Sequence, residues 1–207
     1  MTKDEFPLLW AYVEDRIGEF ELIPDKRKEL LFQLACEIRK EVDAHQSVNL
    51  VFICTHNSRR SHMSHLWAQM ASGFYEIEEV RCFSGGTEST AFNPRAVKAL
   101  QDAGMRIEKQ DDSANPLYHV RFPGSGEGIS TFSKRVAEPP NPTKNFVAVM
   151  TCSDADEACP MVPGAAARYS ITFEDPKVFD NTPEETVRYD EKCAQIAREM
   201  FFLFSRV

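Results

Sequence analysis

Hydrophobic and polar residues follow helical spacing in the first 46 residues. Two stripes of apolar side chains recur there at intervals of three and four, with Pro24 between them. Such spacing places apolar side chains on one face of a helix, so the pattern predicts two helices that break at Pro24. The stripes are Leu8, Leu9, Tyr12, Val13, Ile17 and Phe20, then Leu30, Leu31, Leu34, Ile38 and Val42. We interpret residues 1–47 as an N-terminal helical extension packed on the flank of the domain or on a second subunit. A lid or partner-binding segment is the alternative.

From residue 48 onward, short apolar runs alternate with helical patterns. This alternation is typical of α/β folds, in which right-handed crossovers build a parallel sheet. Ligands in such sheets bind at the carboxyl ends of the strands, where Cys54, Cys152 and Asp175 would lie. We expect strands at 48–53, 78–84, 146–151 and 168–173, and helices at 61–74, 93–104 and 183–204.

Residues 48–207 are predicted to form one domain with an insertion at about 110–145, where the α/β pattern lapses. Within this insertion, residues 118–122 and 129–136 have strand-like composition and flank a glycine-rich turn, which predicts a hairpin. The proline-rich segment 139–142 predicts an ordered loop or linker after the hairpin.

Length, charge and cysteine usage narrow the class of protein. The 207 residues suffice for a full core, and 43% hydrophobic and 27% charged residues are ordinary for a soluble globular chain. No apolar run is long enough to span a bilayer, and a net charge of −8 argues against a nucleic-acid-binding face. The N-terminus lacks the pattern of a secretory signal, so we expect a cytoplasmic protein. In that reducing compartment, the six cysteines are expected as core residues, catalytic thiols or metal ligands.

One cysteine lies in a pattern typical of a nucleophile. Cys54 follows an apolar run, and Arg60 comes six positions later at the start of a helical pattern. A helix N-terminus, a ring of backbone N–H groups and a guanidinium all favour a thiolate, and the same donors would hold a tetrahedral oxyanion. The planar fork of Arg60 can bind two oxygens at once. A buried structural cysteine is the alternative. The predicted substrate-binding residues are Thr55, His56, Asn57, Ser58, Arg59 and Ser61.

Two further cysteines and an acid follow later strands. Cys152 comes after the third predicted strand, and Cys159 is seven residues farther on. The two can meet only if the segment between them refolds, because a disulfide requires Cα atoms within about 7 Å, and such a pair suits a transient catalytic bond. Independent buried cysteines or half of a zinc site are the alternatives, but the ligand spacing is poor for zinc and we expect no metal. Asp175, held extended by the next proline, fits a general acid, or else a turn-forming residue.

Together these residues resemble the low-molecular-weight protein tyrosine phosphatase superfamily, and within it the thioredoxin-coupled arsenate reductases. The resemblance covers about residues 48–205 and implies a three-layer fold in which helices flank a four-stranded parallel sheet. It departs from the family pattern at His56, Arg59 and His65. The motifs that it rests on are Cys54, Asn57, Arg60 and Ser61; residues 84–88 and 93–96; residues 152–156 with Cys159 and Pro160; and Asp175 with Pro176.

The resemblance also implies a mechanism. Cys54 would attack arsenate held by Arg60 and the loop amides, while Asp175 protonates the departing hydroxide. Cys152 would then attack the Cys54 sulfur and release arsenite. Cys159 would resolve that disulfide, and thioredoxin, as electron donor, would reduce the Cys152–Cys159 bond. No bound cofactor is implied, and whether a monovalent cation tunes the site is left open.

Two other functions fit the same residues. A phosphatase would hydrolyse a phosphate monoester, such as an aryl phosphate, through a phospho-Cys54 intermediate, with the later cysteines as bystanders. A redox or oxyanion sensor would form the disulfide and expose the N-terminal helices without turnover. The sequence does not reveal the oligomeric state. We interpret Cys36, Cys82 and Cys193 as core packing.

Overall fold

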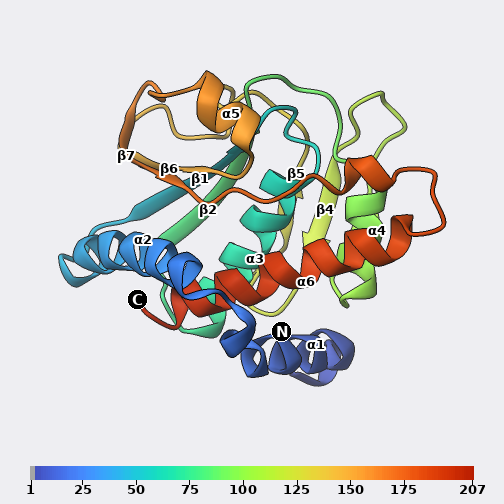
Figure 1. Cartoon of the computed structure of the whole chain (residues 1–207), viewed down its shortest axis with the longest axis horizontal. Helices are drawn as coiled ribbons and strands as arrows, with labels where there is room; N and C mark the ends of the chain where they lie inside the picture. The colour runs from blue at the N-terminus through green and yellow to red at the C-terminus, as the bar shows by residue number, and fades with distance from the viewer. Residues whose placement is uncertain (1–2) are drawn as a thin grey trace.

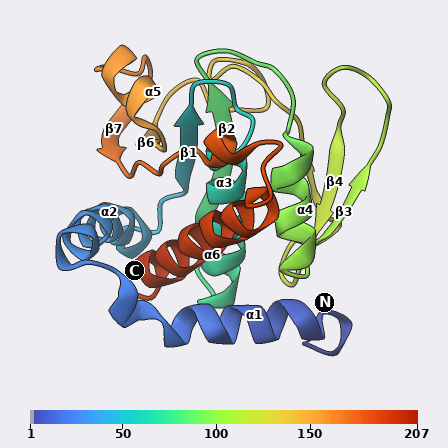
Figure 2. The same cartoon turned by 45° about the vertical axis from the view of Figure 1, so that its right-hand side comes forward.

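The computed structural model describes residues 3–207 and places a parallel β-sheet between layers of helices (Figure 1, Figure 2). Four parallel strands form this sheet in the order β2-β1-β6-β7. A three-stranded antiparallel sheet in the order β3-β4-β5 lies beside it. The predicted three-layer α/β architecture is confirmed.

The chain forms the following elements. The strands are β1 (Val48–Cys54), β2 (Val80–Gly86), β3 (Arg106–Lys109), β4 (Tyr118–Arg121), β5 (Ile129–Thr131), β6 (Phe146–Met150) and β7 (Ala165–Ser170). The α-helices are α1 (Pro7–Gly18), α2 (Asp25–Asp43), α3 (Arg60–Phe74), α4 (Pro94–Asp102), α5 (Ser153–Ala158) and α6 (Glu185–Phe204). Short 3₁₀ helices are η1 (Lys3–Glu5), η2 (Phe20–Leu22) and η3 (Pro176–Phe179).

Strand β1 lies in the centre of the main sheet and is buried on both faces. Leu50 and Phe52 belong to the large core that includes side chains of α3 and α6, whereas Val51 and Ile53 belong to a smaller cluster with α5. A strand covered on both faces has apolar residues at successive positions, as this sequence does. In the ladder Cys54 pairs with Gly86 of β2, so β1 delivers this cysteine to the carboxyl edge of the sheet.

One strand lies three residues away from its predicted position. The prediction of 168–173 is wrong because β7 pairs with β6 from Ala165, and the ladder ends where Ser170 meets Met150. Ile171 and Phe173 are buried beyond the end of the strand, so burial rather than ladder pairing produced the apolar pattern there. The other strands of the main sheet, and the three helices predicted after residue 48, lie within two residues of their predicted bounds.

The N-terminal helices pack on the same core as the sheet, chiefly against α6, and their break at Pro24 is confirmed. The Tyr12 ring of α1 stacks on Trp67 of α3, with centroids 5.5 Å apart and planes 11° apart. Arg27 of α2 donates to Glu199 of α6 at 2.7 Å. These contacts support packing on the flank of the domain, whereas the boundary at residue 47 stays a prediction.

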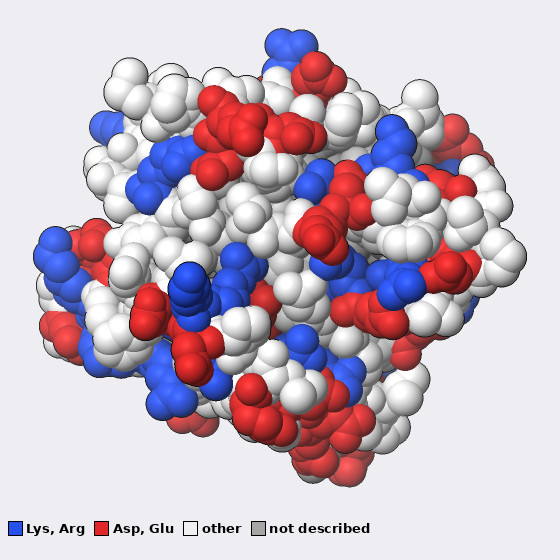
Figure 3. Space-filling view, viewed as in Figure 1, with Lys and Arg blue, Asp and Glu red and all other residues white. Residues whose placement is uncertain are grey.

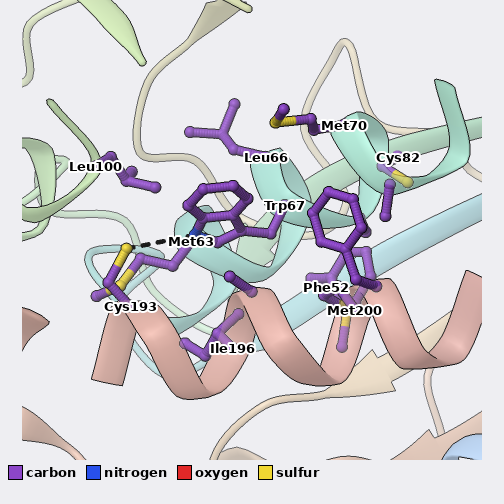
Figure 4. Close-up of a cluster of buried hydrophobic side chains, with 14 of the residues drawn as sticks. Phe52, Met63, Leu66, Trp67, Met70, Cys82, Leu100, Cys193, Ile196 and Met200 are labelled. Atoms are coloured by element: carbon purple, nitrogen blue, oxygen red, sulfur yellow. Dashed lines mark hydrogen bonds between the residues drawn. The ribbon is translucent and has the colours of Figure 1, made fainter. Parts of the chain in front are cut away.

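The core also accounts for most of the cysteines outside the predicted site. Cys82 and Cys193 are buried as expected, and the Trp67 indole donates to Cys193 Sγ at 3.3 Å (Figure 4). The prediction for Cys36 is wrong, because Cys36 is exposed. Its neighbours Leu34 and Ala35 are buried on the inner stripe of α2, and the next step along the helix turns Cys36 away from that stripe. All six cysteines are free thiols.

The insertion contains the predicted hairpin, because β4 pairs with β5 in antiparallel fashion. Its second strand is shorter than predicted, since after Thr131 the chain leaves the hairpin and runs beside the end of β2. There Gly86 N donates to Lys134 O, and Val136 N donates to Gly86 O, both at 2.9 Å. The sequence pattern missed β3, because only Ile107 of that strand is buried. None of the helices in residues 3–207 is both long and apolar enough to cross a membrane.

Candidate active site

The loop at residues 54–61, called here the oxyanion loop, joins the end of β1 to the start of α3. Asn57 has φ +44°, and a left-handed residue in a short loop turns successive backbone N–H groups toward one point. The N-cap of α3 is Arg59, whose side chain makes no capping hydrogen bond in the described structure. The N–H groups at the positive end of that helix are therefore available to an anion.

A relay of hydrogen bonds ends on the Cys54 sulfur. Lys134 N donates to Asn57 Oδ1 at 2.9 Å, which fixes the orientation of the Asn57 amide. Asn57 Nδ2 then donates to Ser61 Oγ at 2.9 Å, and Ser61 Oγ lies 3.1 Å from Cys54 Sγ. Because the Ser61 oxygen already accepts a hydrogen from Asn57, its own hydroxyl hydrogen can point at the sulfur. The relay therefore places a hydrogen-bond donor against the Cys54 sulfur.

The carbonyl groups of the oxyanion loop are held from outside. Thr55 O accepts from Glu88 N at 2.8 Å, and His56 O accepts from Ser133 Oγ at 3.0 Å. The Ser58 carbonyl accepts from the N–H that precedes α4. The His56 side chain is 43% exposed, with Nε2 lying 3.8 Å from a Glu88 carboxylate oxygen. With its carbonyls engaged outward, the loop keeps its N–H groups for a ligand.

Gly86, at the end of β2, lets the backbone of the oxyanion loop approach closely. A Cβ atom at this position would lie 2.2 Å from Glu88 O, 2.7 Å from Asn57 N and 2.7 Å from Thr55 O. All three are backbone atoms, so they have no side-chain rotation with which to make room. A residue with a side chain would therefore push the loop out of shape.

Arg60 and Asp175 meet at the mouth of the loop. Arg60 donates through one guanidinium nitrogen to Asp175 Oδ2 at 2.7 Å and through the other to Phe173 O at 3.0 Å. Asp175 is extended, as predicted, and caps η3 by accepting from Lys177 N at 3.0 Å. A second guanidinium nitrogen, from Arg59, lies 3.6 Å from the same Asp175 oxygen. The carboxyl group is thus held between two arginines.

Arg59 continues this network toward α6. Its Nε donates to the Tyr189 hydroxyl at 3.0 Å, and Tyr189 donates in turn to Asp180 Oδ1 at 2.8 Å. Burial raises the pKa of Tyr189, so the phenol keeps the proton that it donates. The Arg59 side chain therefore braces Asp175, and its predicted contact with substrate stays a prediction.

Cys152 lies against the oxyanion loop at the end of the neighbouring strand. It is fully buried in the same cluster as Cys54, and its Sγ lies 3.5 Å from Thr55 Oγ1. Cys152 is the N-cap of α5, where its sulfur accepts from Ala155 N at 3.4 Å. Cys159 is the C-cap of the same helix and is partly exposed.

Two histidines and a lysine are buried behind the oxyanion loop. Burial, reinforced by the Lys134 charge, lowers the pKa of His65 to about 3 and that of His62 well below its usual range. Burial likewise lowers the pKa of Lys134 to about 8, although Glu138 opposes this shift. The Lys134 ammonium donates to Phe132 O at 3.4 Å and lies 5.0 Å from the centroid of that ring.

The structure therefore brings together most residues that the sequence singled out. The oxyanion loop, Cys152 and Asp175 converge at the carboxyl edge of the sheet, and Cys159 lies one short helix away. Sequence reasoning missed the supporting roles of Gly86, Lys134 and Tyr189. The glycine pair at the end of β2 was a usable signal, because a strand seldom ends in two residues without side chains unless another backbone approaches.

The chain is similar to known proteins that are named arsenate reductases. A protein from Shouchella clausii (strain KSM-K16) named arsenate reductase is 30% identical over 139 residues, which cover 66% of this chain and 79% of that relative. An arsenate reductase from Bacillus subtilis (strain 168) is 30% identical over 136 residues, with the same two coverages. No protein-family model matches the chain.

Solved structures share the fold at low sequence identity. A low-molecular-weight protein tyrosine phosphatase from T. tengcongensis aligns with a TM-score of 0.53 and 16% identity, covering 78% of this chain and all of that one. An arsenate reductase in the phosphate binding state aligns with a TM-score of 0.51 and 16% identity, covering 77% and 98% of the two chains.

Proposed function

The chain belongs to the arsenate reductase family, and we propose that it reduces arsenate to arsenite. The observation that carries the proposal is the position of Cys152. This thiol is buried in the Cys54 cluster, and its sulfur contacts the hydroxyl of Thr55 in the oxyanion loop. Hydrolysis of an ester needs no second thiol beside the nucleophile, whereas transfer of two electrons to arsenic does.

The first proposed step is attack by Cys54 on arsenate. The loop N–H groups and Arg60 hold the oxyanion, and the Asn57–Ser61 relay supports the thiolate. An arsenate oxygen that accepts from Arg60 competes with Asp175 for the guanidinium. Once released from Arg60, Asp175 takes up a proton from solvent and donates it to the departing oxygen, so that the As–O bond breaks while an As–S bond forms.

The second step transfers the electrons. Cys152 attacks the Cys54 sulfur, the As–S electron pair stays on arsenic, and As(V) becomes As(III) and leaves as arsenite. The two sulfurs are together oxidised by two electrons to a disulfide. Cys159 then attacks Cys152, which frees Cys54 and moves the disulfide to Cys152–Cys159. A dithiol donor, for which we propose thioredoxin, reduces that bond.

Steady-state arsenite production tests this proposal, with arsenate, thioredoxin, thioredoxin reductase and NADPH. Cys152→Ser should lower the rate of arsenite production at least a hundredfold, because the step that reduces arsenic has lost its nucleophile. Cys36→Ser is the matched control, since this exposed cysteine on α2 should leave turnover unchanged. Undiminished arsenite production by Cys152→Ser would overturn the reductase assignment.

A phosphatase is the second candidate, and a surface groove beside Asp175 favours it. The groove has a volume of about 620 Å³ and is lined in part by Pro176, Val178 and Phe179. Such a wall could receive the organic group of an aryl phosphate bound by the same oxyanion loop. This function predicts hydrolysis of p-nitrophenyl phosphate that survives Cys152→Ser and Cys159→Ser but is lost in Cys54→Ser. Hydrolysis at a rate above that of arsenate reduction would favour it.

A further inference from the structure

The segment between the two later thiols is a folded helix, and it separates them. Cys152 and Cys159 are the N-cap and C-cap of α5. Seven residues at a helical rise span about 10 Å, which exceeds the Cα separation of about 7 Å that a disulfide tolerates. If the proposed reductase function holds, on which this inference rests, α5 must unwind in every catalytic cycle before the two sulfurs can join.

Helix α5 has little stability of its own. It is six residues long, below the length at which isolated helices persist, and Ala155 is its one buried residue. Its last turn has no basic residue, and Glu157 adds a negative charge near the C-terminal end, which the helix dipole disfavours. The contacts that hold α5 against the sheet therefore decide how often it opens.

Arg168 of β7 supplies those contacts at the C-terminal end of α5. Its guanidinium donates to Asp156 O at 2.7 Å, to Cys159 O at 3.1 Å and to the Asp156 carboxylate. Ser170 of the same strand donates to that carboxylate as well. The two carbonyls belong to the last turn, whose acceptors have no partner within a helix. Figure 3 shows acidic side chains gathered over α5 with basic atoms beside them over β7.

We propose that Arg168 is a latch that holds α5 folded and thereby sets the rate at which Cys152 and Cys159 can join. The latch keeps Cys152 buried beside Cys54 during the steps on arsenic. It releases when the last turn of α5 exchanges the guanidinium for water. The guanidinium of Arg168 contacts backbone carbonyls of α5 and the side chains of Asp156 and Ser170, so it acts through the helix and is a positioning residue.

Alkylation by iodoacetamide, read at each cysteine by peptide mass spectrometry, tests the latch in the whole protein without arsenate. Cys152 is fully buried, so it reacts only when α5 opens, whereas partly exposed Cys159 serves as an internal reference. Arg168→Gln should raise the Cys152 rate about tenfold relative to Cys159. Arg168→Lys keeps the charge without the fork and should give a smaller rise. Cys193, buried in the core, should stay unreactive and so exclude global unfolding.

The matched control is Arg188→Gln, which removes exposed ion pairs of this α6 residue with Glu184 and Glu191. It should leave every alkylation rate unchanged. An unchanged Cys152 rate in Arg168→Gln, or a rise that Cys193 shares in both Arg168 variants, would overturn the latch. Failure of arsenite production in the wild type would instead overturn the proposed function, because alkylation needs no turnover.

Discussion

Lys134 allows a quantitative test of the electrostatics behind the oxyanion loop. Its side chain is 4% exposed, and burial lowers its pKa to about 8 from an ordinary 10.5. The charged group that acts on it is Glu138, which favours the ammonium. The buried His62 and His65 nearby have lowered pKa values and carry no charge at pH 7. At pH 7 the folded protein therefore holds a lysine charge that the unfolded chain would hold at lower cost.

The cost follows from the two pKa values. Each pH unit between them corresponds to 1.36 kcal/mol, so the charged ammonium lowers the free energy of unfolding by about 3 kcal/mol at pH 7. As pH rises from about 8 to 10.5, the folded state has already released its proton while the unfolded chain still binds one. Stability contributed by this group consequently rises with pH, and the penalty falls to about 1 kcal/mol at pH 10.

Lys134→Met removes the charge and keeps an unbranched side chain of similar length. At pH 7 we expect the variant to gain about 3 kcal/mol in free energy of unfolding from loss of the buried charge, and to lose about 1 kcal/mol of that gain with the ammonium contact to Phe132. At pH 10 its advantage over the wild type should be about 2 kcal/mol smaller than at pH 7. Urea unfolding followed by tryptophan fluorescence at both pH values, with reductant present, measures the difference. Tyrosines and cysteines titrate in both proteins and cancel. A difference in free energy of unfolding between variant and wild type that does not change with pH, or a variant less stable than the wild type at pH 7, would refute the reasoning.

Two further predictions concern residues around the oxyanion loop. Gly86→Ala should weaken inorganic phosphate binding at least tenfold by calorimetry, because its Cβ would lie 2.7 Å from Asn57 N; wild-type affinity would contradict this. His65 stays neutral in the folded protein down to a pKa of about 3 while the unfolded chain takes up a proton near pH 6.5, so wild-type stability falls as pH drops through that range. Between pH 7.5 and pH 5, the free energy of unfolding of His65→Leu should therefore fall by about 2 kcal/mol less than that of the wild type, as measured by urea unfolding. Equal losses in the two proteins would contradict a neutral His65 in the folded state.

The sequence could predict those parts of the site that are contiguous in the chain. Cys54 and Arg60 lie in one loop, and the run before them has the continuous apolar pattern of a strand covered on both faces. Asp175 was visible because the proline after it restricts its backbone. Each of these signals is local, so no knowledge of distant contacts was needed.

The supports of the site come from contacts between distant segments, which periodicity does not reveal. Lys134 lies in the insertion, yet its N–H sets the orientation of Asn57. Tyr189 has the spacing of a core residue on α6, and its hydroxyl braces Arg59. β3 was missed for the opposite reason, since a strand with one buried residue has almost no apolar pattern.

The stacking of Tyr12 on Trp67 bears on how this protein can be shortened. Trp67 lies on α3, the helix that starts in the oxyanion loop, so α1 and α3 share an aromatic ring contact. Leu9 and Val13 of that first helix are completely shielded from water, and each contributes about 2 kcal/mol by its burial. A polypeptide beginning at Val48 would retain every proposed catalytic group, but it would expose apolar side chains along α6 and so favour self-association. Helices α1 and α2 thus cover one side of the core, and fragments for biochemical work are better trimmed elsewhere.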